Sequence, residues 1–324
     1  MSLPLYLEAL EKEIVQTQYG EKPVELYAPL GYLMSLGGKR MRPCLTLMAA
    51  NLWLYNWQKM IRPALAVEVF HNFTLMHDDI MDQATLRRNM PTVHEKWDVN
   101  TAILSGDVML VAAYELFNDV EEKHYKRVIK RFNRTAAEVC EGQQLDMLYA
   151  TKAKVSKDEY LEMIRLKTSV LLGFALELGG IIADGDEESV AALYEIGVNM
   201  GLGFQVHDDI LDLYGDPEKF GKKIGGDIIE KKKTWLLIDA LEVADGTEYD
   251  KILKAYLSKK TAVNDADVKA MQEMFIELGV KNRAEACAGA YFDLAVAAIG
   301  RLHISDDKKE KMYGFVNQIK NRES

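Results

Sequence analysis

An acidic motif that occurs twice contains the residues in this sequence best suited to chemistry. The first copy, HDDIMD, spans His77–Asp82, and the second, HDDILD, spans His207–Asp212. On a helix, side chains four residues apart lie on one face about 6 Å from each other, so the first and last aspartates of each D-D-x-x-D point together. Like charges repel at this spacing, and the apolar flanks of both motifs predict poor screening by solvent. A cation is therefore expected between the carboxylates.

The chemistry of these ligands indicates which cation is expected. Carboxylate oxygens with room for water suit Mg²⁺, which takes phosphate oxygens of a substrate as its remaining ligands. A solvated acidic helix face is the alternative, but it leaves both the repetition and the apolar flanks unexplained. We therefore expect a magnesium site that binds a phosphorylated substrate.

Basic residues follow both acidic motifs and also form a compact turn near the N-terminus. They lie at Arg87–Arg88, Lys222–Lys223, Lys231–Lys233 and in the glycine-containing stretch Gly37–Arg42. Guanidinium and ammonium groups bind phosphate oxygens, and glycines let backbone N–H groups approach an anion closely. Each run taken alone reads as a solvated basic turn. Together with both acidic motifs, they favour binding of a metal-bound diphosphate.

Composition excludes several classes of protein. The 324 residues are 48% apolar and 28% charged, which excludes a disordered tail. A net charge of −10 argues against a broad nucleic-acid surface, which needs a basic stripe. The three cysteines lie far apart without metal-ligand spacing, so we expect core thiols in a reducing compartment and no zinc site.

The pattern along the chain predicts an all-α fold. Apolar residues recur at three- and four-residue spacing, and the seven prolines leave room for long helices. No linker or short repeat divides the sequence, so we expect a single domain over residues 1–324. The N-terminus lacks the pattern of a signal peptide, and the longest apolar stretch, 170–183, is interrupted by Glu177 and is too short to span a bilayer. A cytoplasmic protein without a membrane span is expected.

Two predicted helices carry the acidic motifs. One begins at Pro63 and runs to about Asp82, roughly 30 Å of rod. The other begins near Ser189 as N-cap and runs to about Tyr214, with Gly215 and Pro217 as its stop. Its internal glycines, Gly197, Gly201 and Gly203, predict close approach of a neighbouring helix.

These motifs in combination resemble the trans-isoprenyl diphosphate synthases of the polyprenyl synthetase family. The resemblance rests on GGKRMRP at 37–43, the first acidic motif with His71 and the following arginines, GD at 106–107, GQ at 142–143 with Asp146, KT at 167–168, FQ before the second acidic motif, and GKKIGGD at 221–227. It implies an all-helical fold around a deep central cavity, a homodimer, and Mg²⁺ as cofactor, with three ions beside the bound diphosphate.

The resemblance also implies roles for individual residues. Asp78, Asp82 and Asp208 correspond to metal ligands, and Asp79, Asp209 and Asp212 support the metal or its water. The allylic diphosphate would be held by Arg87, Lys167, Thr168, Gln205, Lys222 and Lys232, of which Arg87, Lys167 and Lys222 would also act in catalysis with the metal ligands. The isopentenyl diphosphate would be held by Gly38, Lys39, Arg42, His71 and Arg88.

Three positions depart from the family pattern. Lys223 stands where proline is common, and Lys231 stands where glycine usually precedes the lysine at 232. The role of Lys232 depends on that segment. His207 before the second acidic pair is also less usual, and we interpret it as a packed or supporting histidine, not a catalyst.

The implied reaction is ionisation of an allylic diphosphate, attack by the double bond of isopentenyl diphosphate, and loss of a proton. Phe73 lies five residues before Asp78, about 7.5 Å along the helix, with Phe70 one further turn away and Thr74 beside it. The resemblance implies that an aromatic residue here limits the product to geranylgeranyl or farnesyl diphosphate. Ordinary core packing of both rings is the alternative.

Other functions stay open at this stage. They are a synthase of longer polyprenyl diphosphates, a terpene cyclase, a non-catalytic helical subunit, and a plain magnesium-binding helical module. A cyclase usually carries an N/D-rich second metal motif, whereas this chain has a second D-D-x-x-D together with the basic turn at Gly38–Arg42. We therefore expect a prenyltransferase of isoprenoid biosynthesis whose partners are isopentenyl and allylic diphosphates.

Overall fold

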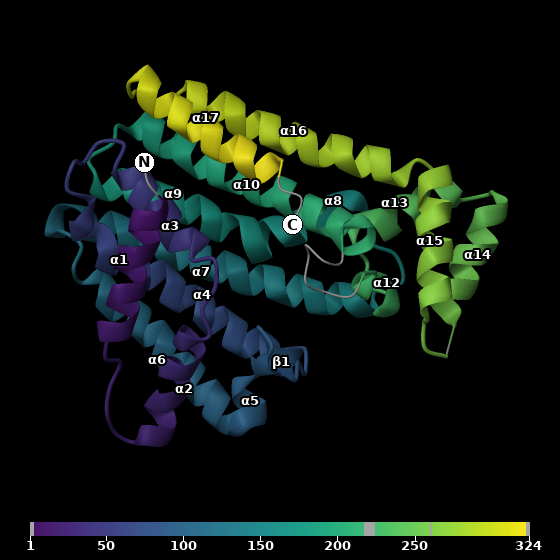
Figure 1. The fold of residues 1–324 in the computed structure, drawn as a ribbon, viewed down its shortest axis with the longest axis horizontal. Coiled ribbons are helices and arrows are strands. Elements are labelled where there is room, and N and C mark those ends of the chain that lie inside the picture. Colours follow the sequence, from purple (N-terminus) through teal and green to yellow (C-terminus); the bar gives the residue numbers. More distant parts are fainter. Residues whose placement is uncertain (1–2, 217–223, 260, 322–324) are drawn as a thin grey trace. The chain divides into compact units, whose positions relative to one another are not determined.

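A computed structural model describes residues 3–216, 224–259 and 261–321 of the chain (Figure 1). The chain forms two compact units. Unit 1 comprises Met1–Ala136, Leu171–Tyr194 and Leu302–Lys308, and unit 2 comprises Ala137–Val170, Glu195–Arg301 and Lys309–Ser324. In the described residues the secondary structure is helical apart from one short hairpin, which confirms the all-α fold. One domain over the whole chain stays a prediction.

Unit 1 contains a succession of helices around α4, the helix that carries the first acidic motif. Its elements are α1 (Leu3–Gln16), α2 (Val24–Ser35), α3 (Met41–Ala50), a 3₁₀ turn (Trp57–Met60), α4 (Ile61–Met81), β1 (Leu86–Arg87), β2 (Met90–Pro91), α5 (Val93–Lys96) and α6 (Val99–Phe117). It also includes the first part of α7 (Glu122–Thr151), most of α9 (Val170–Ile182) and the start of α10 (Glu187–Tyr214).

A cluster of aromatic rings forms part of the core of unit 1. Phe70 of α4 lies 5.1 Å from Phe132 of α7, measured between ring centroids, and Phe117 of α6 lies 4.8 Å from Phe132. Phe174 of α9 completes the cluster, and all four side chains are fully buried. Burying each such ring stabilises the fold by about 1.5–3 kcal/mol. The cluster therefore fixes α4, and with it the position of the first acidic motif in this unit.

A tight hairpin follows α4 and places the two arginines of the first motif. Strands β1 and β2 pair antiparallel, with Arg87 opposite Met90. The two residues of the turn, Arg88 and Asn89, have φ of 53° and 63°. Positive φ at both central positions is the type I′ turn that suits the twist of a two-residue hairpin. The chain therefore reverses within a few residues of Asp82.

Unit 2 contains the second acidic motif and the helices that surround it. Its elements are the remainder of α7, α8 (Lys157–Ile164), a π-helical turn (Arg165–Ser169), most of α10, α12 (Gly226–Ile229), α13 (Trp235–Ala244), α14 (Glu248–Ser258), α15 (Asp265–Glu277), α16 (Val280–Gly300) and most of α17 (Asp306–Lys320). Buried side chains from α8, α10, α13, α15 and α16 form one continuous apolar core.

Glycines allow close helix packing in unit 2, as the sequence predicts for α10. A Cβ at Gly201 would lie 2.6 Å from the Ser169 hydroxyl, and one at Gly203 would lie 2.9 Å from the Phe292 ring. In α7, a Cβ at Gly142 would lie 2.2 Å from the backbone nitrogen of Lys167. The π-helical turn that carries Lys167 can therefore approach α7 because residue 142 has no side chain.

The predicted boundaries of the two motif-bearing helices are close to those observed. Helix α4 begins at Ile61, two residues before Pro63, and Asp82 is its C-cap. Helix α10 begins at Glu187, so Ser189 as N-cap is wrong. The carboxylate of Asp186 accepts hydrogen bonds from the backbone N–H and hydroxyl of Ser189, at 3.0 and 2.7 Å, and caps the helix instead. Pro217 lies outside the described residues.

Helix α6 is long and apolar enough to cross a membrane by length and composition, the one such helix in the part of the chain that the structure describes. It packs along α4 and also contacts α2 and α5. Its N-terminus is capped by the side chain of Asp98. Core helices of soluble proteins pass the same test, so length and composition do not make α6 a membrane span.

Replacing Gly142 with alanine tests the close approach of α7 to the π-helical turn. The new Cβ would overlap the backbone of Lys167, so we expect Gly142→Ala to destabilise the protein by about 1–3 kcal/mol. Gly289→Ala in α16 is the matched control, because among the described residues no atom lies within 4 Å of its added Cβ. There we expect no loss, or a gain of about 0.5–1 kcal/mol from helix propensity. Chemical denaturation of both variants measures the difference, and equal stability would contradict the packing.

Candidate active site

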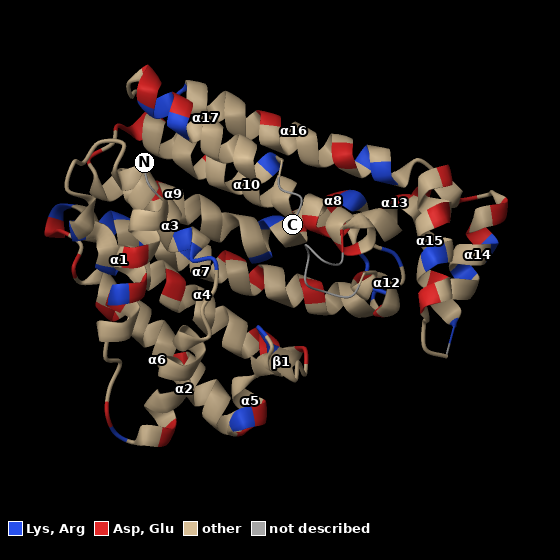
Figure 2. Cartoon of the chain, in the orientation of Figure 1, with Lys and Arg blue, Asp and Glu red and all other residues tan. Residues whose placement is uncertain are grey.

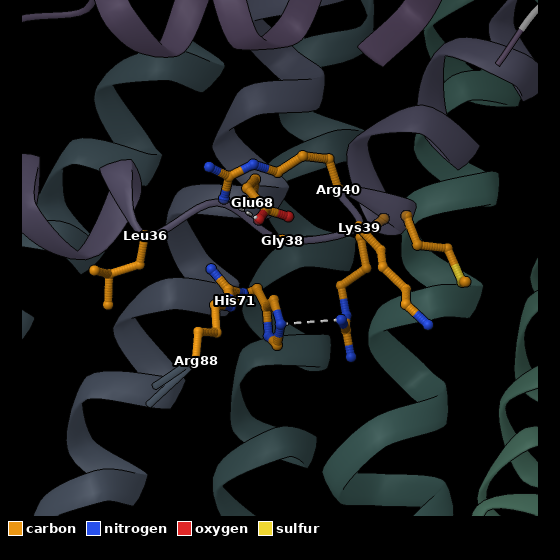
Figure 3. Close-up of a pocket in the computed structure, with 9 residues that line it drawn as sticks. Leu36, Gly38, Lys39, Arg40, Glu68, His71 and Arg88 are labelled. Atoms are coloured by element: carbon orange, nitrogen blue, oxygen red, sulfur yellow. Dashed lines mark hydrogen bonds and ion pairs between the residues drawn. The ribbon is translucent and has the colours of Figure 1, made fainter. Parts of the chain in front are cut away.

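A basic cavity lies in unit 1 between the turn before α3 and the middle of α4. Its volume is about 550 Å³. Figure 3 shows its lining, which consists of Leu36, Gly38, Lys39, Arg40, Met41, Arg42, Glu68, His71 and Arg88. The lining holds all five residues that the sequence predicts for isopentenyl diphosphate. The structure therefore brings together residues that are separated by up to 50 positions in the chain.

Arg40 lines this cavity but is held by the protein. Its side chain is fully buried, and its guanidinium donates to Glu11 at 2.8 Å, to Glu68 at 2.9 Å and to the carbonyl of Met34 at 2.6 Å. Its backbone has φ of 43°, in the left-handed region, at the N-cap of α3. A left-handed backbone conformation is unfavourable for a residue other than glycine, and it persists only where surrounding contacts stabilise it. Arg40 therefore anchors the turn that carries Lys39 and Arg42.

Arg42 and His71 are two polar residues of the lining that contact each other. The Arg42 Nη1 lies 3.0 Å from the His71 Nε2 (Figure 3). A guanidinium can only donate, so Nε2 accepts and the ring carries its proton on Nδ1. Burial holds the pKa of His71 well below its ordinary value, and the nearby guanidinium of Arg42 lowers it further. The ring is neutral at physiological pH.

Arg42 is a half-buried, charged residue of the lining. The Nε of Arg42 is buried and has no hydrogen-bond partner among the described residues. Burial lowers the pKa of Arg42, whereas the carboxylate of Glu68 raises it. A guanidinium still stays charged in a protein. Arg42 therefore adds a charged guanidinium to the lining of the cavity.

Arg88 closes the cavity from the hairpin. Its Nη1 donates to the carbonyl of Gly37. A Cβ at Gly38 would lie 2.7 Å from the Arg88 Nη2, and the φ of Gly38 is +137°, a conformation that L side chains rarely adopt. The backbone therefore favours glycine at position 38, and a side chain there would displace the Arg88 guanidinium.

The first acidic motif lies at the C-terminal end of α4. Asp79 is 2% exposed, and its two oxygens accept from the Nε and Nη2 of Arg87, each at 2.7 Å. Asp78 is half-buried and Asp82 is exposed. The C-terminus of a helix carries partial negative charge, so carboxylates there repel it as well as each other. The protein neutralises Asp79 through Arg87, and a cation would offset the charge on Asp78 and Asp82.

His77, just before the first motif, packs against α6. Its Nε2 lies 3.2 Å from the carbonyl of Ile103 and 3.9 Å from a carboxylate oxygen of Asp107. A Cβ at Gly106 would lie 2.2 Å from the same nitrogen, so a side chain at position 106 would displace the His77 ring. The Gly106–Asp107 pair noted in the sequence therefore contacts this histidine, with Gly106 leaving room for its ring and Asp107 lying beside its Nε2.

The second acidic motif repeats this arrangement in α10. Asp209 is buried and accepts from the hydroxyl of Tyr160 at 2.7 Å and from the backbone N–H of Trp235 at 3.0 Å. Burial, and after it the charge of Asp227, raise the pKa of Asp209 to about 8. Asp208 and Asp212 are half-buried, and Asp212 Oδ2 accepts from the backbone N–H of Asp227 at 3.0 Å. In both motifs the middle aspartate is bound by the protein.

Cationic side chains lie beside acidic ones in unit 2. Lys167 Nζ lies 2.6 Å from an oxygen of Asp146, and Lys232 Nζ lies 3.9 Å from Asp227. Burial would lower the pKa of Lys232, but the carboxylates of Asp227 and Asp146 outweigh it and raise that pKa. Thr168 and Gln205 are half-buried, on the π-helical turn and on α10. Lys222, like its neighbour Lys223, lies outside the described residues.

The donor set fits Mg²⁺ with ligands added by a substrate. Among the described residues, no group of three or more His, Cys, Asp or Glu side chains is close enough to hold a metal ion without further ligands. Mg²⁺ is usually bound by one or two carboxylates, with phosphate oxygens and waters completing its octahedron. The i and i+4 aspartates of each motif can supply that share. Figure 2 shows acidic and basic residues together at the β1 hairpin that follows the first motif.

The predicted chain-length residues occupy different surroundings in α4. Phe70 is fully enclosed by the aromatic cluster. Phe73 is 9% exposed, lies 5.6 Å from Phe70 and 4.8 Å from the His77 ring, and so stands at the edge of the cluster toward the acidic motif. The Thr74 hydroxyl donates to the carbonyl of His71 at 2.8 Å. Of the two rings, Phe73 is therefore the one better placed to meet a ligand.

Four residues that matter in this geometry received no role from sequence reasoning. Glu68 pairs with Arg40, and its signal is a lone carboxylate in the apolar run before His71. Asp146 and Asp227 stand inside motifs that the sequence singles out, beside the lysines they face. Tyr160 leaves no local signal, because Asp209 lies 49 positions away.

Comparison with known proteins identifies the class and then the family. The helical fold, the two D-D-x-x-D motifs and the similarity to known synthases define a prenyltransferase. Residues 23–275 match the family model described as polyprenyl synthetase, and the chain belongs to the polyprenyl synthetase family.

Curated relatives and a solved structure are similar over much or all of the chain. The geranylgeranyl pyrophosphate synthase of Geoglobus acetivorans is 36% identical over 295 residues, which cover 90% of this chain and 89% of that protein. The geranylgeranyl diphosphate synthase of Methanosarcina mazei is 44% identical over 224 residues, covering 68% and 69%. The crystal structure of a geranylgeranyl pyrophosphate synthase superposes with a TM-score of 0.92 and 42% identity, covering 100% of both chains.

The neutral state of His71 predicts how stability changes with pH. Its folded-state pKa lies below its unfolded value, so the unfolded chain takes up a proton first as the pH falls below about 6.5. The contribution of the neutral His71 ring to the free energy of unfolding is therefore fully present well above pH 6.5. It is lost as the pH falls below that value, by at most about 1.4 kcal/mol per pH unit. His71→Gln keeps an acceptor for Arg42 but does not titrate. We expect the stability advantage of wild type over His71→Gln to shrink between pH 7.5 and 5.5 in urea denaturation, and a constant difference would contradict the neutral ring.

Proposed function

We propose that this prenyltransferase condenses isopentenyl diphosphate with allylic diphosphates, in the presence of Mg²⁺, to make geranylgeranyl diphosphate. The observation that carries the proposal is the basic cavity in unit 1, where Lys39, Arg42 and Arg88 surround a neutral histidine. Such a cavity suits a small diphosphate. The geranylgeranyl diphosphate synthases to which the chain is similar support the choice of product.

The cavity is the proposed site of isopentenyl diphosphate. Lys39 and Arg42 would bind its phosphate oxygens, and Arg88 would do so from the hairpin. Because Arg40 anchors the turn, the donors of Lys39 and Arg42 are held in place before the substrate arrives. Preorganised donors cost little reorganisation at the moment of reaction. His71 orients Arg42 through its Nε2 without adding a further positive charge.

The allylic diphosphate is the proposed ligand of the acidic motifs and the lysines of unit 2. Asp78, Asp82 and Asp208 would hold Mg²⁺, while Asp79, Asp209 and Asp212 fix the surrounding backbone and side chains through the contacts described above. Bound Mg²⁺, which we propose as three ions, would stabilise the charge on the departing diphosphate. Lys167, Thr168, Gln205, Lys222 and Lys232 would bind its oxygens, together with the Nη1 of Arg87.

Positioning supplies the rest of the rate enhancement. The charged groups bind the leaving diphosphate more strongly as its negative charge grows, so they stabilise the transition state more than the ground state. Holding the isopentenyl double bond next to the allylic carbon replaces a bimolecular encounter by an oriented one. No nucleophile from the protein is needed for this reaction.

Assembly, compartment and domain count complete the proposal. We propose a homodimer in the cytoplasm, on the resemblance of the motifs and on the reducing environment that the separated cysteines suggest. The pattern of the sequence supports both units acting as one synthase domain over residues 1–324.

A pair of adjacent aspartates separates metal binding from structural support. Asp78→Asn removes a proposed magnesium ligand, so we expect turnover to fall about a hundredfold or more with little change in stability. Asp79→Asn leaves Arg87 without its carboxylate partner, so we expect a loss of about 1–3 kcal/mol in unfolding free energy. Steady-state assays and denaturation of both variants provide the test. Near-normal Mg²⁺-dependent turnover in Asp78→Asn would refute the metal assignment.

The two phenylalanines of α4 give a second comparison. Phe73→Ala removes the ring at the edge of the cluster, so we expect products longer than those of the wild type. Phe70→Ala opens a cavity in the core, so we expect a loss of about 3–5 kcal/mol in stability without a matching lengthening of the product. Chromatographic sizing of the prenyl products measures the effect. An unchanged distribution in Phe73→Ala would remove this residue as the limit on chain length.

A further inference from the structure

Three consecutive lysines, Lys231, Lys232 and Lys233, bind different parts of unit 2. They follow α12 and precede α13. Lys231 reaches the end of α14, Lys233 reaches the end of α7, and Lys232 faces Asp227. A solvated basic run would leave all three ammonium groups in water, so this arrangement calls for a separate explanation.

Lys231 is fixed at both its backbone and its side chain. Its φ is 55°, a left-handed conformation that is uncommon outside glycine. Its Nζ donates to the carbonyls of Leu257, at 3.3 Å, and Lys259, and it lies 5.8 Å from the centre of the Tyr256 ring. The carbonyls at the end of a helix lack partners within the helix and carry partial negative charge, so an ammonium group binds them favourably. Glycine is the usual residue at this position in the family pattern. The lysine side chain therefore makes contacts here that glycine could not make.

Lys233 forms the corresponding anchor on the other side. Its Nζ donates to the carbonyls of Tyr149 and Ala150, at 2.8 and 2.9 Å, near the C-terminus of α7. Burial lowers the pKa of Lys233. Both anchors use the same device, an ammonium group on exposed helix-end carbonyls. The chain on either side of Lys232 is thus tied to two separate helices of unit 2.

Backbone contacts leave the intervening segment little freedom. The N–H of Lys232 donates to the carbonyl of Asp227 at 2.8 Å, and the N–H of Gly225 donates to the carbonyl of Asp212 at 2.7 Å. The Tyr256 hydroxyl donates to the carbonyl of Ile228 at 2.6 Å. The side chain of Lys232 is 55% exposed and lies on the acidic side of the segment. Lys232 is therefore carried by a restrained backbone.

We propose that Lys231 is a positioning residue that, together with Lys233, holds Lys232 where it binds the allylic diphosphate. This inference rests on the proposed function, which assigns that ligand to Lys232. Anchoring from both sides reduces the conformational entropy that Lys232 must lose on binding. The lysine at position 231 thus makes the end of α14 part of the support of the allylic site.

Steady-state kinetics of three variants test the proposal. Lys231→Met keeps the length of the side chain and removes the donor, so we expect the KM for the allylic diphosphate to rise about fivefold, with kcat within about twofold of the wild type. The KM for isopentenyl diphosphate should not change, because its proposed cavity lies in unit 1. Lys231→Arg can still donate to both carbonyls and should restore the allylic KM. Lys254→Met, which removes an exposed lysine of α14 paired with Asp250, should behave as the wild type.

Amide hydrogen exchange on the free proteins gives a readout that does not depend on activity. We expect faster exchange at residues 226–234 in Lys231→Met than in the wild type or in Lys231→Arg. An unchanged allylic KM in Lys231→Met, or a rise in both KM values together with a general loss of stability, would overturn the proposal. If the wild type itself condenses no allylic substrate, the proposed function fails, whereas unchanged exchange at residues 226–234 refutes the anchor.

Discussion

The structure depends on the cost of placing carboxylates close together on a helix. Both acidic motifs put aspartates four residues apart, and the first also lies at the negative end of α4. The protein offsets part of this cost itself. Arg87 neutralises Asp79, and Tyr160 with the backbone N–H of Trp235 binds Asp209. The outer aspartates of each motif are the proposed ligands of an added cation.

The same contacts organise the elements around each motif. The fork of Arg87 ties the β1 hairpin to α4, and this hairpin carries Arg88 to the basic cavity. Asp209 ties the start of α13 and, through Tyr160, α8 to α10. Asp79 therefore links α4 to the hairpin that carries Arg88, and Asp209 links α10 to the start of α13, just after the three lysines. Acidic and basic residues are positioned by one set of interactions within each unit.

Sequence patterns predict much of this arrangement, because helix periodicity and short motifs are local. The all-α fold is confirmed, α4 and α10 lie within three residues of their predicted starts, and the five residues of the basic turn, α4 and the hairpin meet in one cavity. The motifs alone do not show which aspartate is hydrogen-bonded by other residues of the protein. The partners of Asp209, for example, are 49 and 26 positions away in the sequence. In the same way, the different contacts of Lys231 and Lys233 depend on the ends of α14 and α7, which are distant in the sequence. Long-range pairing of this kind has no periodic signal in a single sequence.

Calorimetric titration with an unreactive thio analogue of an allylic diphosphate tests the central claim most directly. The account predicts that the wild type binds the analogue much more tightly with Mg²⁺ than without it, and that Asp78→Asn and Asp208→Asn each lose most of this Mg²⁺-dependent gain. Binding that does not depend on Mg²⁺, or a full gain retained in both variants, would contradict it.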